Sequence, residues 1–166
     1  MKKMNLTILM TLLFSPFVFA GGIHKKDKQE VSYLTKQDFR ADFPKAQTVQ
    51  WNRDKEYSEA TFVNKGMKMH AFYNWDGNLS STTHDYAYNS LPEAARNNIA
   101  RQYKNYTVEK TIVLKDDESN LNDLFPLVPY EYRTNYFVLL KKNDQPEQII
   151  LHVTPDGNVS YFKTMK

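Results

Sequence analysis

The chain has 166 residues, with 22 Lys and Arg against 19 Asp and Glu, and no cysteine. Without cysteine there are no disulfides and no thiol chemistry, so the fold must be stabilised by its apolar core. Basic residues gather only in short pairs such as Lys141 and Lys142, which argues against the clustered positive face that nucleic-acid binding needs.

Residues 1–20, MKKMNLTILMTLLFSPFVFA, are predicted to be a secretory signal peptide. Two early lysines precede an apolar run, and Val18 and Ala20 form a V-x-A cleavage site. A Ser-Pro pair interrupts the run, which is already shorter than the roughly 20 residues of a spanning helix. We therefore expect cleavage after Ala20, a periplasmic or secreted protein, and no stable membrane insertion.

The segment YLTKQDFRADFPKA predicts a short helix of about two turns. Thr35 is the expected N-cap, with an Asp three residues later, and Leu34 and Phe39 are placed as a hydrophobic staple across it. Phe39 and Phe43 share one face, and Pro44 stops the helix.

Four strands are predicted to follow, in QTVQWNR, EYSEATFVNKG, MKMHAFYNWDG and NLSSTTHDYAY, because apolar and polar residues alternate with a period of two. In the third strand the two sets face opposite sides of the sheet. The expected core face carries Met67, Met69, Ala71, Tyr73 and Trp75, and the other face carries Lys68, His70, Phe72 and Asn74.

The same order of elements is predicted again. In SLPEAARNNIARQYKNY, Ser90 and Glu93 have the spacing of a capping box, with Pro92 in the first turn. Strands are predicted in TVEKTIVLK, YEYRTNYFVLLKK, PEQIILHVTP and NVSYFKTMK. The apolar stripe of the helix consists of Leu91, Ala95, Ile99, Tyr103 and Tyr106.

Aligning the sequences of the two halves indicates an internal repeat. Phe39 matches Ile99 at an offset of 60, whereas Gly77 matches Gly157 at an offset of 80. The difference of 20 predicts an insertion at about 114–133, an acidic segment that we interpret as a recognition loop. The predicted organisation is a flexible leader at 21–32, repeat one at 33–88 and repeat two at 89–166.

The tripeptide Asp-Gly-Asn occurs at 76–78 and again at 156–158. A calcium loop of the EF-hand type with Gly77 or Gly157 at its sixth position would place Phe72 or His152 at the first, where an oxygen ligand is required. Asp-Gly is also the preferred chemistry of two-residue hairpin turns, in which both residues take positive φ. We therefore predict two hairpin turns and no metal.

No catalytic or metal site is predicted. The four histidines lack metal-ligand spacing, and the chain has no G-x-S-x-G and no order of Ser, His and acid that suggests a triad. We expect no enzyme and no cofactor. An enzyme whose site is assembled only in the fold is the third alternative.

The runs DFPKAQTVQW, EATFVNKG, MHAFYNWDGNL and LPEAARNNIARQY resemble the PepSY-like domain of small exported bacterial proteins, which is related in structure to β-lactamase-inhibitor protein. The resemblance implies an α+β fold. It would be a tandem repeat of a short helix plus a four-stranded antiparallel sheet, forming one curved sheet with helices on one face and the other face open. It implies no catalytic residues and fixes no binding residues.

The resulting hypothesis is an exported, non-catalytic binding module that binds or inhibits a protein or peptide through the open face of its sheet. The alternative is a carrier or sensor of a small apolar ligand in the cell envelope. The partner is not identified, and neither nucleic acid nor metal is expected. The candidate binding residues are Tyr57, Thr61, His70, Phe72, Ile150 and His152.

Overall fold

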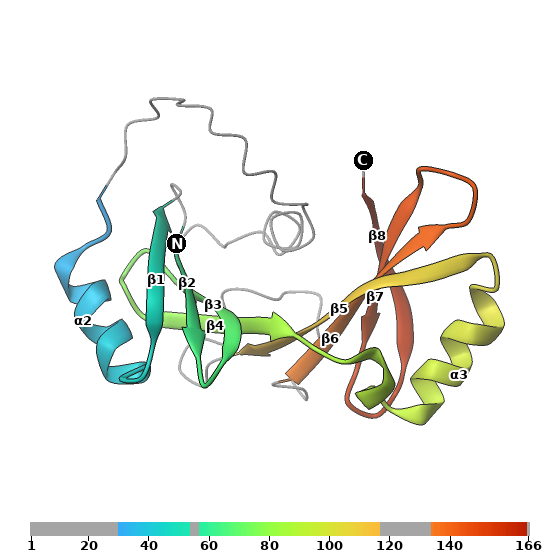
Figure 1. The fold of residues 1–166 in the computed structure, drawn as a ribbon, viewed down its shortest axis with the longest axis horizontal. Coiled ribbons are helices and arrows are strands. Elements are labelled where there is room, and N and C mark those ends of the chain that lie inside the picture. Colours follow the sequence, from blue (N-terminus) through green and yellow to red (C-terminus); the bar gives the residue numbers. More distant parts are fainter. Residues whose placement is uncertain (1–29, 54–56, 117–133, 166) are drawn as a thin grey trace. The chain divides into compact units, whose positions relative to one another are not determined.

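A computed structural model describes residues 30–53, 57–116 and 134–165 (Figure 1). The predicted signal peptide, nearly all of the leader and most of the predicted insertion lie outside the described residues. The described elements are α2 (Tyr33–Asp42), β1 (Gln47–Arg53), β2 (Ser58–Asn64), β3 (Met67–Tyr73), β4 (Leu79–Asp85), a short 3-10 helix η1 (Tyr88–Ser90), α3 (Glu93–Gln102), β5 (Tyr106–Asp116), β6 (Thr134–Lys142), β7 (Gln148–Val153) and β8 (Val159–Met165).

The eight strands lie in chain order, from β1 to β8, in one open sheet. The pairs β1–β2, β2–β3, β5–β6, β6–β7 and β7–β8 are antiparallel. The α+β class and all eight predicted strands are thus confirmed. The described residues up to Ser81 form one compact unit and those from Thr82 onward form a second. None of the described helices is long and apolar enough to cross a membrane.

In the first unit α2 covers one face of strands β1 to β3. Phe39 of α2 meets Phe62 edge-on with ring centroids 4.9 Å apart, and Trp51 at 5.2 Å. Ala60, Phe62, Ala71 and Tyr73 are buried with Phe39 in one cluster. The predicted core face of β3 is confirmed at Met69, Ala71 and Tyr73.

Two residues expected on that core face are exposed instead. Met67 is 48% exposed because it begins β3 directly after the Lys65–Gly66 turn. Trp75 is 69% exposed because β3 ends at Tyr73, so Trp75 lies in the following loop.

The start of α2 differs from the prediction. The N-cap is Ser32, whose Oγ accepts a hydrogen bond from the backbone N–H of Thr35 at 3.0 Å. Thr35 lies inside the helix and is buried, and Leu34 is 68% exposed, so the predicted staple is absent. Ser32 and Thr35 both carry a hydroxyl group that could cap a helix, and α2 begins one turn earlier than the predicted cap at Thr35 indicated. The predicted contact of Phe39 with Phe43 is confirmed at 5.3 Å.

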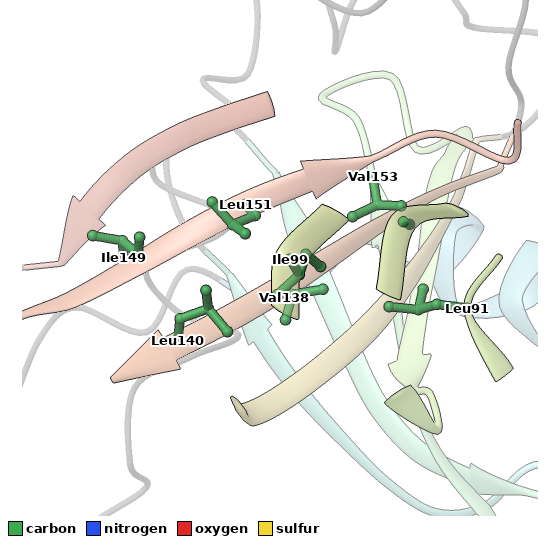
Figure 2. Close-up of a cluster of buried hydrophobic side chains, with 8 residues drawn as sticks. Leu91, Ile99, Val138, Leu140, Ile149, Leu151 and Val153 are labelled. Carbon is green, nitrogen blue, oxygen red and sulfur yellow. The ribbon is translucent and has the colours of Figure 1, made fainter. Parts of the chain in front are cut away.

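The second unit has an aliphatic core beneath α3 (Figure 2). Ile99 of α3 packs with buried residues of β6 and β7, which confirms the predicted apolar stripe. The buried cluster consists of Leu91, Ala95, Ile99, Val138, Leu140, Ile149, Leu151 and Val153, with Tyr103 and Tyr106 partly buried against it. Burying each large aliphatic side chain contributes about 1.5–3 kcal/mol before the entropic cost.

The predicted capping box of α3 does not form. Ser90 ends η1, and the N-cap position of α3 is Pro92, which makes no side-chain capping hydrogen bond. The S-x-x-E spacing is present, but the 3-10 turn and the extended backbone at Leu91 separate Ser90 from the helix start.

The two Asp-Gly-Asn segments form hairpin loops with the same geometry. The N–H of Gly77 donates to the carbonyl of Asn74 at 3.0 Å, and that of Gly157 donates to the carbonyl of Thr154 at 2.9 Å. Gly77 and Gly157 have φ of 88° and 91°, whereas neither Asp has positive φ. The predicted two-residue turn is therefore wrong in detail, because the loop is the three-residue kind that ends in a left-handed Gly.

Each glycine lies against the start of the helix in its own unit. A Cβ on Gly77 would meet the Thr35 hydroxyl oxygen at 2.9 Å. A Cβ on Gly157 would meet the Cβ of Ala94 at 3.2 Å and that of Pro92 at 3.3 Å. Both loops therefore need Gly for two reasons, the backbone conformation and the close approach.

Candidate functional site

Four of the six predicted binding residues lie on the face of the first unit that α2 does not cover. Tyr57 and Phe72 have ring centroids 6.0 Å apart, and His70 stacks on Phe72 at 6.4 Å. Thr61 pairs with His70 across β2 and β3. Tyr57 and Phe72 are 4% and 0% exposed, whereas Thr61 and His70 are half-buried.

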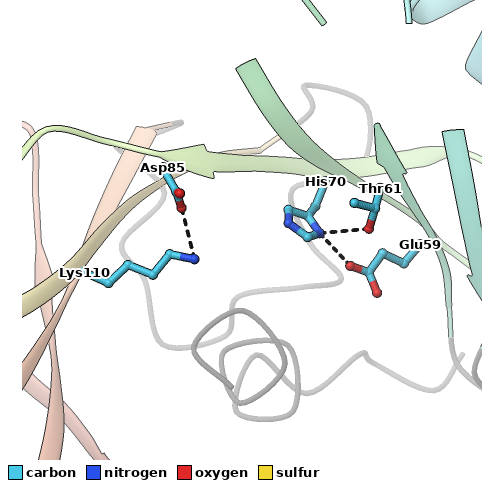
Figure 3. A network of polar contacts seen from close by, with 5 residues as sticks. All are labelled: Glu59, Thr61, His70, Asp85 and Lys110. Atoms are coloured by element: carbon cyan, nitrogen blue, oxygen red, sulfur yellow. Dashed lines mark hydrogen bonds and ion pairs between the residues drawn. The ribbon is translucent and has the colours of Figure 1, made fainter. Parts of the chain in front are cut away.

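A polar network lies among these side chains, with Glu59 and Thr61 both directed at one ring nitrogen of His70 (Figure 3). The Nδ1 atom of His70 is 2.7 Å from Oε1 of Glu59 and 3.2 Å from Oγ1 of Thr61. The Glu59 side chain is 8% exposed. A buried carboxyl group requires such a partner, and in the tautomer with a hydrogen on Nδ1 the His70 ring would donate a hydrogen bond to Oε1 of Glu59.

This arrangement orients the His70 ring but does not make a catalytic site by itself. A hydrolytic triad also needs a nucleophile in hydrogen-bond reach of the free ring nitrogen, and no such contact is found in the described part of the chain. Nor, within that part, do three His, Cys, Asp or Glu converge as metal ligands.

The remaining two predicted residues, Ile150 and His152, belong to the second unit and lie on the face that α3 does not cover. Ile150 is fully buried, and the Nε2 atom of His152 is 2.8 Å from Oδ1 of Asn135. The ring of His152 packs on Phe137 at 5.2 Å. Burial lowers the pKa of His152, since the charged imidazole would lose its hydration.

At these positions the side chains on the face away from the helices are buried. Apolar residues occupy both faces of the strands, and those on the second face are buried as deeply as those beneath the helices. They are 0–4% exposed in the set Tyr57, Phe72, Ile112, Leu114, Phe137, Leu139 and Ile150. Partner binding by the six predicted residues stays a prediction.

Two charged features accompany this face in the second unit. Asp116 ends β5, and burial raises its pKa to about 7, while its Oδ1 atom has no hydrogen-bond partner among the residues that the structure describes. Lys110 forms an ion pair with Asp85 at 3.0 Å (Figure 3). Both side chains of that pair are solvent-accessible, so we expect it to contribute little stability.

A second candidate site lies on the helix side of the first unit. A half-open groove of about 310 Å³ runs between α2 and β1. Lys36 and Arg40 of α2 line it, and Val49 is 37% exposed in it. The other lining residues are Phe39, Phe43, Pro44, Ala46 and Trp51.

The sequence did not indicate Glu59, Asn135 or the groove as functional features. Glu59 meets His70 only because Thr61 lies directly opposite His70, which makes Glu59 the diagonal neighbour across two strands. Part of the groove could be read from the sequence. Lys36 and Arg40 are four residues apart, as are Phe39 and Phe43, and this spacing places the two members of each pair on the same side of a helix.

The fold is similar to that of several solved structures from Bacteroides. A BLIP-like protein from Bacteroides fragilis NCTC 9343 shares 18% identity over 81% of this chain and 86% of its own, with a TM-score of 0.63. A DUF2874 family protein from Bacteroides ovatus ATCC 8483 shares 19% identity over 82% and 87%, with a TM-score of 0.65. A protein of Bacteroides eggerthii DSM 20697, provisionally assigned to the periplasm, shares 17% over 82% and 88%, also with a TM-score of 0.65.

These similarities establish a BLIP-like α+β fold, and at such low identity they establish the fold alone. The sequence matches no protein-family profile and no curated protein.

Proposed function

We propose that this protein is an exported, non-catalytic binding module that docks a protein or peptide. The observation that carries the proposal is the apolar character of both faces of the strands. The face of an antiparallel sheet that carries no helix is commonly solvated and polar. Here it carries Tyr57 and Phe72 in the first unit and Phe137 and Ile150 in the second.

The fold similarity supports the same class of function. One structural neighbour is described as BLIP-like and another is provisionally assigned to the periplasm. By extension, we propose a cleavable signal peptide ending at Ala20 and a periplasmic or secreted location. We also propose membership of the PepSY-like group and descent of the two halves from one duplicated unit. The repeated order of a helix and four antiparallel strands supports the last point.

In this proposal the partner reaches the half-buried side chains of Thr61 and His70 in the first unit, beside the buried ring of Phe72. In the second unit, His152 is the half-buried candidate. Inhibition of an enzyme is one form that such docking would take. The Glu59–His70 pair would present the second ring nitrogen of His70 to the partner as a hydrogen-bonding group.

Site-specific photocrosslinking in the envelope of the native host tests the proposal. Lys68 is exposed and lies on the same face as His70 and Phe72, so a benzoylphenylalanine there should yield a discrete crosslinked partner. The matched control carries the same group at Asn97, an exposed position on α3. An identical product pattern at both positions would contradict docking on this face.

The same apolar face also supports the alternative, a carrier of a small apolar ligand. Native mass spectrometry of the protein purified from its own host distinguishes the two. A carrier would retain a ligand of defined mass, whereas a protein-binding module would be recovered at its polypeptide mass.

A further inference from the structure

The groove between α2 and β1 combines a free strand edge with apolar walls. β1 is the first strand in the order of the sheet, and in the described residues it has a neighbouring strand, β2, on one side only. Its partner residues follow without interruption from Gln50 to Arg53. In an antiparallel ladder alternate residues direct their N–H and C=O groups away from the neighbouring strand, so this stretch offers unused hydrogen-bonding groups at the edge.

The other end of β1 is closed to such pairing. The register shifts between Gln47 and Gln50, and Thr48 has a φ of 52°, which is a left-handed conformation. A bulge of this kind protects an edge strand from indiscriminate pairing. An added strand would therefore be confined to Gln50–Arg53, the stretch that includes Trp51 of the groove.

The charge of the groove selects the partner. Lys36 and Arg40 lie one turn apart on α2, and no carboxylate is among the described residues that line the groove. The ammonium of Lys36 is 4.0 Å from Oε1 of Glu30, whose side chain is 93% exposed. So exposed a pair is weak and easily exchanged for another carboxylate.

The volume and shape favour a peptide over a compact ligand. At about 310 Å³ the groove is at the lower limit of small-ligand sites, which span ~300–1,000 Å³ and usually enclose most of the ligand. This groove is half-open, and two of its lining residues, Val49 and Trp51, belong to the edge strand β1. Peptide recognition by strand addition uses this combination of main-chain hydrogen bonds and pockets for alternate side chains.

We infer that the α2–β1 groove binds an extended peptide segment with an apolar centre and acidic flanks, which adds as a strand to Gln50–Arg53. Its apolar side chains would enter between Phe43 and Trp51, and its carboxylates would pair with Lys36 and Arg40. This inference rests on the proposed function and adds to it a second docking site, which lies on the helix side of the first unit and does not include Thr61 or His70.

The test uses the full mature chain with Trp75→Phe. The chain has two tryptophans, so this substitution leaves Trp51 as the single fluorescent indole. The probes are blocked heptapeptides with Asp-Glu before and Glu-Glu after a three-residue centre drawn from Val, Leu, Phe and Tyr. We expect a saturable change in Trp51 fluorescence. Analogues with Lys in place of every acidic residue should bind about tenfold more weakly or not at all.

Variants and modified peptides test the two parts of the inference separately. Arg40→Glu should weaken binding about tenfold, and Arg101→Glu, an exposed cation at the end of α3, should leave it unchanged. Because only one edge of the added strand faces β1, N-methylation of one alternating set of peptide residues should abolish binding, and N-methylation of the other set should not.

Three outcomes would overturn the inference: no saturable binding by any acidic peptide, equal binding of acidic and basic peptides, or an effect of Arg101→Glu equal to that of Arg40→Glu. If the crosslinker at Lys68 captures a partner while the peptides fail, the groove is refuted and the binding module stands. If both fail, the proposed function fails as well.

Discussion

Replacing Gly157 by Ala should destabilise the protein more than replacing a glycine in an open turn. Both Gly157 and Gly66 have positive φ, of 91° and 78°, so alanine at either position is strained by about 1–2 kcal/mol. Only Gly157 has close neighbours. Its new Cβ would lie 3.2 Å from Ala94, 3.3 Å from Pro92 and 3.4 Å from the backbone N of Ala95.

The added crowding cannot be relieved by rotating a side chain, because the neighbours are the short, stiff first residues of α3. Overpacking of this kind costs about 1–3 kcal/mol. We therefore expect Gly66→Ala to lower the free energy of unfolding by about 1 kcal/mol and Gly157→Ala to lower it by about 2–4 kcal/mol. Gly77→Ala should fall between them, because its Cβ meets the hydroxyl oxygen of Thr35 at 2.9 Å and a side chain can turn away.

Urea denaturation of the three variants, followed by far-ultraviolet circular dichroism, measures these differences by linear extrapolation. Gly66→Ala is the matched control for backbone strain. If Gly157→Ala and Gly66→Ala differ by less than about 0.5 kcal/mol, the packing of the loop against α3 does not constrain the fold, and the reasoning is refuted.

Two further predictions concern the helix start and the pH dependence. Ser32→Ala should lower the free energy of unfolding by about 1 kcal/mol in urea denaturation, because the hydrogen bond from Thr35 N–H to the cap is lost. Ser90→Ala removes no cap and should lower it by less than about 0.5 kcal/mol. Equal effects of the two substitutions would contradict the assignment of the caps. The pKa of Asp116 is raised from 3.8 to about 7, so the folded state holds the proton more tightly and stability should fall as pH rises from about 4 to 7. Asp116→Asn should therefore add about 2–4 kcal/mol at pH 8 and almost nothing at pH 4, and an equal effect at both pH values would show that the carboxyl is not desolvated.

The sequence predicted the strands well because a period of two in burial is a local property. The helix caps were predicted poorly for the opposite reason. Ser32, Thr35 and Ser90 all have hydroxyl groups near a helix start, and only the path of the preceding backbone decides which one accepts a hydrogen bond. At Ser90 that path is set by a 3-10 turn with no clear signature in the sequence.

The candidate sites depended still more on tertiary structure. The alternation placed His70 and Phe72 on one face of β3 correctly, but it could not show that Glu59 lies within 2.7 Å of His70, since that distance depends on the register of β2 against β3. Nor could alternation show how deeply Phe72 and Ile150 are buried. The α2–β1 groove needs a helix and a strand to meet, which a pattern along one segment does not report.

The glycine loops also bear on the order in which each unit assembles. The start of α2 contacts the loop between β3 and β4, and the start of α3 contacts the loop between β7 and β8, although each helix precedes both strands of that hairpin in the chain. The contact between each helix start and its glycine loop can therefore form only when that hairpin has closed. Contacts between such distant parts of the chain slow folding, so helix docking should be a late step, and the glycines should affect the unfolding rate more than the folding rate.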